Sequence, residues 1–327
     1  KIGICKINKK INKELSKFNV YEDINSFDKI INSNTDIVIF AISGLDGIDL
    51  MLKLIKSGKK IGIANKECII SIGSNFSKIT KKYSTEIVPL DSEHNSIYHL
   101  LNNRLGTFKS VTITASGGPF RELPFKSFKN IKINEALSHP VWKMGKKISI
   151  DSATMVNKAL EIIEAKYLFN LKDEQITAIV HPQASVHAMI NYSNGITTAL
   201  LNNPDMRIPI SSLFFKFNSY SKYNKELKLT DHSKLEFYSI DPVKFPAMKL
   251  GRDVMAMGGM APHAFNYLND IFVKKFLKGS LKFTDIVLLN EINLERIFAK
   301  NSNIMNPNMS DIKNLNEWIC NNIQVKY

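Results

Sequence analysis

The sequence is poor in cysteine and has no long hydrophobic run. Its three cysteines among 327 residues, Cys5, Cys68 and Cys320, are too few and too scattered for a disulfide framework or a zinc site. No hydrophobic run approaches the roughly 18 residues that cross a bilayer, and no segment has the pattern of a signal peptide. These absences argue against a secreted disulfide scaffold and a membrane protein, so a reducing, intracellular compartment is the default expectation.

Acidic residues are scarcer than basic ones: 30 Asp and Glu stand against 44 Lys and Arg, which gives a net charge of +14. Such an excess attracts the phosphate backbone of nucleic acids. The lysines, however, are spread along the whole chain beside Asn and Ile, a distribution that a coding bias also produces. An anionic small substrate explains a local basic pocket equally well. We therefore expect a small-molecule ligand, and neither nucleic-acid nor membrane binding.

A hydrophobic content of 44% in a chain of this length can fill two or three domains. Residues 36–65 have the pattern of a βαβ unit: the run DIVIFAI, a turn with Gly44 and Gly47, a helical segment ending at Gly58, and the run IGIAN. This pattern predicts a doubly wound parallel sheet, whose ligands bind beyond the carboxyl ends of the strands. The two glycines alone are weak evidence for a nucleotide, because plain tight turns also use glycine.

The order of the elements changes after residue 90. Strand-like runs and a hairpin around Asn194-Gly195 alternate with the helical segment ATMVNKALEIIEAKYLF, and only helical spacing continues beyond a polar stretch. The predicted class is α/β. Its parts are a Rossmann-like parallel sheet in 1–90, a central α/β domain in 91–216, a linker in 217–240 and a C-terminal helical bundle in 241–327.

The segment VPLDSEHN ends an apolar run with Asp91, Ser92 and Glu93. On an extended backbone, carboxylates at i and i+2 project to the same side and form an oxygen-rich corner that suits a hard divalent cation. Alternatively, Asp91 only caps a helix that begins at Ser92 or Glu93. A second polar constellation about sixty residues later, DSATMVNKALE, favours a site that uses both segments.

The segment DSATMVNKALE predicts a helix N-terminus, with Ser152 and Thr154 as candidate N-caps after the strand-like run KKISI. Asn157 and Glu161 are four residues apart and therefore share one helix face, with Lys158 beside them. A helix N-terminus with an added lysine favours an anion such as phosphate. The plain alternative is an exposed pair of Lys158 with Glu161, which contributes little energy.

Two loops complete the candidate site. The segment SGGPFRE follows the strand-like run SVTITA; its glycines let backbone N–H groups approach a ligand and Ser116 adds a hydroxyl, although a structural turn explains it too. The segment LSHPVWKMGKK, with His139 and Trp142, is predicted to be a lid over a ligand or a loop around a core tryptophan. His181 and His187 flank PQASV, and we expect His181 to be structural.

Seven motifs together resemble the 1-deoxy-D-xylulose 5-phosphate reductoisomerase family over about residues 36–300. They stand in the family's order and are NKE (65–67), DSEHN (91–95), SGGPFRE (116–122), HPVWKMGKKISIDSATMVNKALEIIEA (139–165), HPQASVHAM (181–189), PDMR (204–207) and GGMAPHAFNYLND (258–270). In the last motif Asn266 and Asn269 fit the family's paired asparagines, whereas Asp270 stands where a glutamate is usual. Nothing at the start matches the family's GxTGSIG loop. We therefore expect an incomplete dinucleotide domain and a sequence that is part of a longer protein.

The resemblance implies an NADPH- and metal-dependent enzyme that acts as a homodimer. It implies a catalytic group of Lys66, Asp91, Glu93 and Glu161, all but the first of which would bind Mg²⁺ or Mn²⁺. Lys66, Glu93 and Glu161 would also contact the sugar phosphate, together with Ser92, Ser116, His139, Trp142, Ser152, Asn157, Lys158, His187 and Met206. Of these, the residues near the phosphate group would be Ser116, Ser152, Asn157 and Lys158. The nicotinamide cofactor would touch Asn65, Glu67 and Gly145.

The implied reaction converts 1-deoxy-D-xylulose 5-phosphate to 2-C-methyl-D-erythritol 4-phosphate, in isoprenoid precursor biosynthesis, by a skeletal rearrangement and hydride transfer from NADPH. The metal would act as Lewis acid and template, and Lys66 would stabilise oxyanion charge. The alternative is a degenerate homologue with a metal and phosphosugar site, like an aldolase or isomerase, that has lost hydride transfer. We expect a bacterial cytoplasm or a plastid-type organelle, not secretion.

Overall fold

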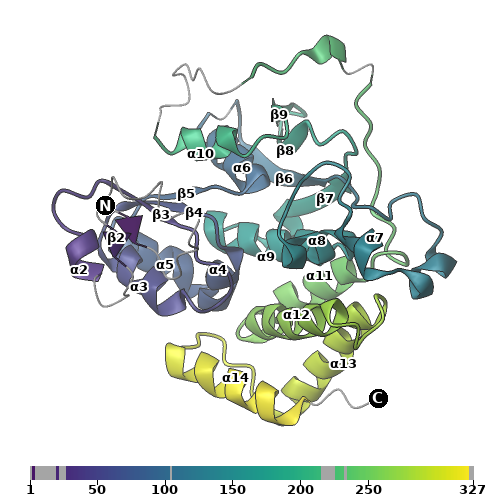
Figure 1. Cartoon of the computed structure of the whole chain (residues 1–327). Helices are drawn as coiled ribbons and strands as arrows, with labels where there is room; N and C mark the ends of the chain where they lie inside the picture. Colours follow the sequence, from purple (N-terminus) through teal and green to yellow (C-terminus); the bar gives the residue numbers. More distant parts are fainter. Residues whose placement is uncertain are drawn as a thin grey trace.

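The computed structural model describes residues 2–3, 20–21, 27–103, 105–214, 225–231 and 234–323. Two sheets with their helices lie beside each other, and a group of C-terminal helices lies below them (Figure 1). A short parallel pair, β1 (Ile2–Gly3) with β2 (Val20–Tyr21), precedes them. Residues 1–18 lie almost wholly outside the described residues. The sequence of this segment does not match a glycine-rich dinucleotide loop.

The predicted βαβ unit is confirmed, because β3 and β4 pair in parallel through the crossing helix α3, and β5 pairs in parallel with β4. The helix buries Ile48, Met51 and Ile55 on one face. Gly58, with φ at +65°, lies just after its end, where a left-handed residue lets the chain turn back. The elements of this part are α2 (Phe27–Ile30), β3 (Ile37–Phe40), α3 (Ile48–Lys56), β4 (Lys60–Ile63), α4 (Lys66–Ile72), α5 (Asn75–Lys82) and β5 (Ile87–Pro89).

The second sheet is mixed, with strand order β7-β6-β8-β9. β6 pairs in parallel with β7 and antiparallel with β8, and the hairpin between β8 and β9 turns at Asn194-Gly195, as predicted. Helix α6 packs on β8. These elements are α6 (Ser92–Asn102), β6 (Phe108–Ala115), β7 (Ile176–Val180), β8 (Val186–Tyr192) and β9 (Thr197–Leu201).

The prediction of a strand at KKISI is wrong, because these residues begin helix α8 (Lys146–Ala153). The alternation of isoleucine with polar residues indicated a strand. In the structure Ile150 and Asp151 are both buried, and Lys147 bonds Asp151 one helical turn away at 2.8 Å. The other elements between β6 and β7 are η2 (Phe125–Asn130), α7 (Ile133–Leu137), α9 (Val156–Phe169) and η3 (Asp173–Gln175).

The part of the chain after residue 241 is helical as predicted, and its described residues contain no strand. The four predicted helical segments correspond to α11 (Ala247–Met257), α12 (Ala261–Leu277), α13 (Asp285–Lys300) and α14 (Met309–Asn322).

The predicted linker, 217–240, is described only in 225–231 and 234–240. It contains η4 (Leu229–Asp231), and Tyr238 pairs with Val180 as an isolated bridge. It follows α10 (Arg207–Ser212). Among the described residues, no helix combines the length and apolar character that crossing a membrane demands.

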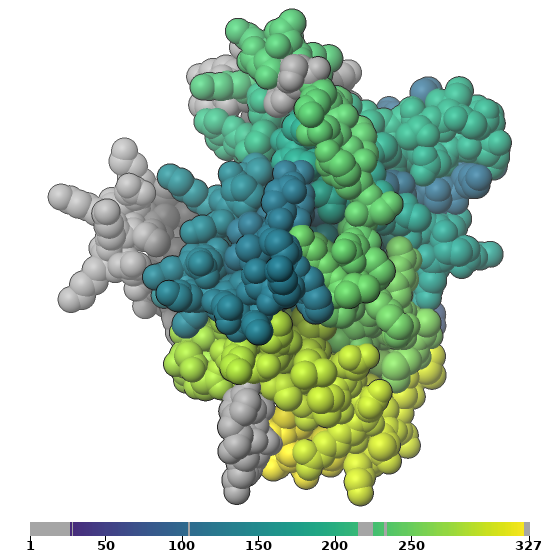
Figure 2. Space-filling model, turned by 90° about the vertical axis from the view of Figure 1, so that its right-hand side faces the viewer, coloured from purple at the N-terminus to yellow at the C-terminus, as the bar shows by residue number. Residues whose placement is uncertain are grey.

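Helix α9 lies where the three parts meet, as Figure 1 shows at the centre of the molecule. It packs against α4 of the first part, against α8 and β7 of the second, and against α11 of the C-terminal helices. Val156, Ala159 and Ile163 are fully buried, so core contacts fix its position. On the face of the molecule that Figure 2 shows, the segment between β6 and α8, in teal-blue, lies against the yellow-green C-terminal helices. Polar side chains on α9 are therefore held at a junction rather than on a free surface.

Candidate active site

The acidic corner forms where β5 ends and α6 begins. Asp91 is the N-cap of α6: its Oδ1 accepts hydrogen bonds from the backbone N–H groups of Glu93 at 3.1 Å and His94 at 3.3 Å. Asp91 therefore does cap the helix, although capping is not its only interaction. The expectation that Asp91 and Glu93 project from one extended strand is wrong, since Glu93 lies in the first helical turn. Capping uses only one oxygen of Asp91 and leaves Oδ2 available to a second partner.

A third carboxylate joins this corner from α9. Ligand oxygens of Asp91, Glu93 and Glu161 all lie within 4.8 Å of one another. Glu161 is fully buried, 1% exposed, while Asp91 and Glu93 are half-buried. Its neighbour Asn157 donates from Nδ2 to Glu161 Oε1, which confirms that the two side chains share a helix face. Three oxygen donors with no sulfur or imidazole among them match the preference of Mg²⁺ or Mn²⁺.

Two lysines neutralise most of the charge of this cluster. Lys66 Nζ lies 3.3 Å from Asp91 Oδ2, 3.4 Å from Glu161 Oε1 and 3.0 Å from Asn157 Oδ1. Lys158 Nζ lies 3.1 Å from Glu93 Oε1 and also donates to Glu161 Oε2. The pair of Lys158 with Glu161 is thus buried, not the exposed pair considered as an alternative. Buried charges persist only when they are paired in this way.

These pairs shift the pKa values of the cluster. Burial alone would lower the pKa of Lys66, but Glu161 and Asp91 hold it well above its usual value. Burial alone would raise the pKa of Asp91, but Lys66 and His94 hold it well below. For Glu161 burial prevails over the attraction of Lys158, and its pKa is raised.

His94 and Glu164 stand behind the carboxylates, and neither was predicted to be a site residue. His94 is fully buried; its Nδ1 lies 2.9 Å from Asp91 Oδ1 and 3.4 Å from Glu164 Oε2, and its Nε2 lies 3.0 Å from the backbone oxygen of Glu161. Burial lowers its pKa, but Glu164 and Asp91 raise it to a net value of about 9. The available signal was position: His94 lies three residues after Asp91, and Glu164 three after Glu161.

The opposite wall of the cleft has no carboxylate among its described lining residues, and its charged side chain is Lys143. Ser116 follows β6, and its Oγ lies 3.1 Å from His139 Nε2. The other ring nitrogen, Nδ1, accepts from the backbone N–H of Trp142 at 2.9 Å and of Val141 at 3.2 Å, so Nε2 is the protonated nitrogen and donates to Ser116. Burial lowers the pKa of His139. The imidazole is therefore a neutral donor.

Trp142 lies over the cleft and not in the core. It is half-buried, and its ring centroid lies 6.5 Å from that of His187. His187 is 2% exposed, burial lowers its pKa to about 4, and its Nε2 has no protein partner among the described residues. His181, by contrast, contacts the oxygen of Glu236 at 2.8 Å and Ser185 Oγ at 3.1 Å, as expected for a structural histidine.

The two walls enclose a cavity of ≈ 260 Å³. Predicted residues that line it are Asp91, Ser92, Glu93, Ser116, His139, Trp142, Ser152, Asn157, Lys158, Glu161, His187 and Met206. Lys66 reaches the carboxylates from behind this lining. Sequence reasoning missed other lining residues, namely Thr114, Ala115, Gly117, Lys143, Met144, Ile148, Met155 and Ala184. Half of these directly adjoin predicted residues in sequence, and for that half adjacency was the available signal.

The start of α9 differs from the prediction. Neither Ser152 nor Thr154 is its N-cap: Ser152 belongs to the last turn of α8, Thr154 ends that helix, and the N-cap is Met155 with φ at +62°. A left-handed residue joins the two helices without a loop, so no free capping serine is needed. The Ser152 side chain instead lines the cavity beside Asn157.

The residues predicted to touch the nicotinamide lie outside the cavity lining. Asn65 caps α4: its Oδ1 accepts from the N–H of Cys68 at 2.7 Å, and its Nδ2 donates to the oxygens of Ile42 and Gly44. Glu67 Oε1 lies 3.7 Å from Nζ of Lys147, which stands in the first turn of α8. Gly145 is exposed at the start of α8, with open space where a Cβ would stand.

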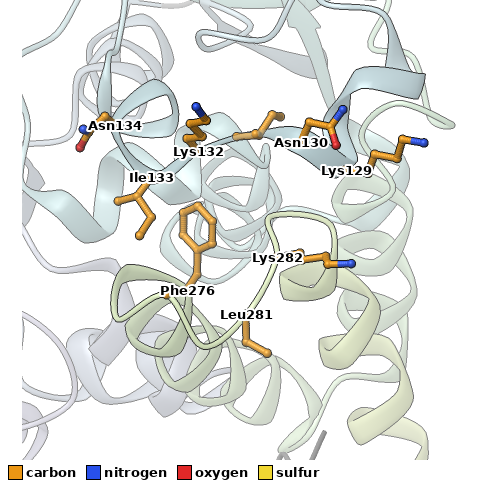
Figure 3. A pocket seen from close by; sticks show the side chains of 10 residues that line it. Lys129, Asn130, Lys132, Ile133, Asn134, Phe276, Leu281 and Lys282 are labelled. Carbon is orange, nitrogen blue, oxygen red and sulfur yellow. The ribbon is translucent and has the colours of Figure 1, made fainter.

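A second hollow, of ≈ 470 Å³, lies between residues 129–134 and 276–282. Figure 3 shows Lys129, Lys132 and Lys282 around Phe276 and Leu281. It is larger than the first cavity, but its described lining residues include no acidic residue and no predicted site residue. Size therefore does not decide which hollow carries the chemistry.

Three family models match successive parts of the chain. Residues 4–73 match "1-deoxy-D-xylulose 5-phosphate reductoisomerase", residues 87–169 match the C-terminal domain of the same enzyme, and residues 201–321 match "DXP reductoisomerase C-terminal domain". The 1-deoxy-D-xylulose 5-phosphate reductoisomerase of Pelagibacter ubique is 41% identical over 310 residues, which cover 93% of this chain and 79% of that protein. That of Vesicomyosocius okutanii is 42% identical over 82% of this chain and 70% of its own.

Solved structures agree in sequence and fold. A DOX-P reductoisomerase crystallised with NADPH, fosmidomycin and magnesium superimposes with a TM-score of 0.84 at 31% identity, over 95% of this chain and 81% of that chain. The Zymomonas mobilis enzyme in complex with NADPH gives 0.83 at 30% identity, over 95% of this chain and 82% of that chain. The predicted fold class is thereby confirmed.

Proposed function

The chain belongs to the 1-deoxy-D-xylulose 5-phosphate reductoisomerase family, and we propose that the carboxylate–lysine cluster of α4, α6 and α9 is its active site. Its function is the NADPH- and metal-dependent conversion of 1-deoxy-D-xylulose 5-phosphate to 2-C-methyl-D-erythritol 4-phosphate in isoprenoid biosynthesis. The observation that carries the site assignment is the convergence of Asp91, Glu93 and Glu161 in the cavity.

The three carboxylates are the proposed ligands of Mg²⁺ or Mn²⁺. The bound ion supplies a Lewis acid and a template for the carbonyl and hydroxyl oxygens of the substrate. The chain contributes the position of the ligands: the first turn of α6 holds Asp91 and Glu93, and α9 holds Glu161. His94 fixes Asp91 through the 2.9 Å contact to its Oδ1. Rigid elements therefore set the ligand geometry in advance.

Lys66 is the proposed stabiliser of negative charge on the reacting oxygens. Glu161 and Asp91 keep its pKa well above the usual value despite burial, so it stays protonated. Its 3.0 Å contact to Asn157 Oδ1 holds the ammonium beside the carboxylates. A fixed cation in a site of low water content stabilises an oxyanion more strongly than a solvated one.

The wall without carboxylates, together with the start of α9, is proposed to bind the rest of the sugar phosphate. Hydroxyl and amide groups would hold the phosphate together with a lysine; they are Ser116, Ser152, Asn157 and Lys158. His139 contributes an Nε2–H donor beside Ser116, and Trp142 covers the cavity. Neutral His187 and Met206 suit the carbon skeleton, and a closed lid excludes water from reactive intermediates.

The cofactor side is proposed to lie at α4 and the start of α8. NADPH supplies the hydride. Gly145 leaves open space for a ligand, and Glu67 is held by Lys147. Asn65 ties the loop after β3 to the first turn of α4, which would keep this edge of the parallel sheet in place for the nicotinamide.

The proposed organisation is a cofactor domain in 1–90, a catalytic domain in 91–216, a linker in 217–240 and a helical domain in 241–327. The parallel sheet, the mixed sheet and the C-terminal helices support this division. We also propose a homodimer in a bacterial cytoplasm or a plastid-type organelle; the relatives from Pelagibacter and Vesicomyosocius are bacterial.

The test uses protein expressed from the complete reading frame. NADPH oxidation should require both 1-deoxy-D-xylulose 5-phosphate and a divalent cation, and EDTA should abolish it. Turnover of the sugar phosphate without NADPH would instead favour the aldolase- or isomerase-like alternative. Absence of any turnover with both cofactors present would refute the proposed active site.

A further inference from the structure

Lys158 is engaged twice in the proposed site. Its ammonium lies 3.1 Å from Glu93 Oε1 and donates to Glu161 Oε2, which are two of the three proposed metal ligands. The same residue lines the cavity and is the lysine proposed to bind the phosphate. The side chain is 4% exposed, so its ammonium is held by the carboxylates rather than by solvent.

The cavity offers few other cations to a phosphate group. Among its described lining residues only Lys143 and Lys158 carry a full positive charge. The two histidines of the lining are neutral, because burial lowers the pKa of both His139 and His187. A phosphate monoester carries between one and two negative charges near neutral pH and needs a cationic partner when it leaves water.

A divalent cation and the Lys158 ammonium draw on the same oxygens. Carboxylates of Glu93 and Glu161 that coordinate a metal ion have less negative charge left for an ammonium, and the two cations repel each other. Lys66 also contacts two proposed ligands, Asp91 and Glu161, but it keeps a neutral partner in Asn157 Oδ1 and does not line the cavity. Lys158 is therefore the lysine that can turn from the carboxylates toward the cavity.

We propose that Lys158 couples the metal site to the phosphate site, because a divalent cation on Glu93 and Glu161 releases its ammonium to the phosphate group. The inference rests on the proposed function, since it assumes those ligands and that phosphate position. By linkage, phosphate must then strengthen metal binding by the same factor by which metal strengthens phosphate binding. The metal ion and the phosphate group should therefore each bind more tightly when the other is present than alone.

The test measures binding equilibria and needs no turnover. Methyl phosphate is titrated into the full-length protein by calorimetry, with and without saturating Mg²⁺; this probe has a phosphate group but no carbonyl–hydroxyl pair to chelate the metal. We expect Mg²⁺ to tighten methyl phosphate binding by about tenfold. The reciprocal titration of Mn²⁺, with and without methyl phosphate, should return the same factor.

Two variants separate Lys158 from a general effect of charge. Lys158→Gln and Lys143→Gln each remove one positive charge from the cavity lining. In Lys158→Gln the coupling factor should fall to about twofold or less, whereas Lys143→Gln should weaken phosphate binding and keep the tenfold factor. An unchanged factor in Lys158→Gln would overturn the proposal, because direct attraction between metal and phosphate would then explain it. Failure of the unmodified protein to bind methyl phosphate at all, with Mn²⁺ still bound, would refute the phosphate assignment of the proposed function itself.

Discussion

The two walls of the cavity treat charge in opposite ways. On one wall three carboxylates, two lysines and His94 are packed into a buried, paired cluster. On the other wall Ser116, His139 and His187 offer hydroxyl and neutral imidazole groups beside Trp142. The two walls can therefore have different roles. The carboxylate wall can hold a metal ion and developing negative charge, while the wall without carboxylates can hold a carbon skeleton and does not compete for the ion.

Two histidines make the contrast quantitative. Both are almost fully buried, and for both burial is the largest influence on the pKa. For His94, Glu164 and Asp91 outweigh burial and raise the pKa to about 9. For His187 burial prevails over the weaker attraction of Asp91, and the pKa falls to about 4. The charged neighbours of a buried imidazole therefore decide whether it is protonated near neutral pH, because burial is similar for both histidines.

The largest expected effect comes from removing a ligand of the carboxylate wall. Glu161→Gln keeps the shape of the side chain but removes its charge, so kcat should fall by at least about 10³-fold. Mn²⁺ affinity, measured by electron paramagnetic resonance, should fall by more than about 100-fold, since even outer partners of a metal ligand contribute 10–100-fold.

Asp151→Asn is the matched control, because it removes another buried carboxylate, paired with Lys147 and Asn269, that does not line the cavity. It should lower the melting temperature but keep the Mn²⁺ affinity. Equal loss of Mn²⁺ binding in both variants would contradict the assignment of Glu161 as a ligand.

An intermediate effect is expected in the pH dependence of stability, measured as melting temperature in EDTA. His94 has a raised pKa in the folded state, so its contribution is complete below about pH 6.5 and is lost as the pH rises toward 9. A shift of this size corresponds to about 3 kcal/mol. The difference between the unmodified protein and His94→Gln should therefore shrink across that range.

His187 should show the opposite slope. Its pKa is lowered in the folded state, so its contribution is present above about pH 6.5 and is lost as the pH falls toward 4. His187→Gln should remove this acid sensitivity and leave the alkaline branch unchanged. Parallel pH profiles for the two variants would show that the two walls do not differ in charge as described.

The smallest expected effect concerns the lid. Trp142→Ala removes the ring that lies 6.5 Å from His187, so KM for the sugar phosphate should rise by about tenfold with a smaller change in kcat. Trp318, the other tryptophan of the chain, packs on the core from α14. Trp318→Ala should lower stability and leave KM unchanged; the reverse result would place Trp142 in the core.

Local patterns in the sequence were sufficient for the parallel sheet, and they identified the residues of the acidic corner although the extended geometry expected for it is wrong. The spacing of Ile48, Met51 and Ile55 predicted α3, and the Asp91–Glu93 pair predicted an oxygen-rich corner. Local pattern failed at KKISI, where alternating isoleucines indicated a strand but contacts of Ile150 and Asp151 across the fold stabilise a helix. A weak intrinsic preference is overridden by tertiary packing in such cases.

The partners of the site residues could not be predicted from spacing. Lys158 is three residues from Glu161, a spacing that left an ordinary surface pair open as an alternative. Its contact to Glu93 joins residues 65 positions apart. His94 likewise reaches the backbone oxygen of Glu161 across 67 positions. Burial converts these contacts from minor surface interactions into the interactions that define the carboxylate wall.

Helix α9 also carries groups of both proposed subsites. Asn157 and Lys158 stand in its first turn and Glu161 one turn further on, yet Asn157 Nδ2 and Lys158 Nζ both donate to the Glu161 carboxylate. In the proposed function this one rigid element would hold a metal ligand and phosphate-binding groups at once. A small rotation of α9 would then disturb both subsites together, and its packing against α4, α8 and α11 opposes such a rotation.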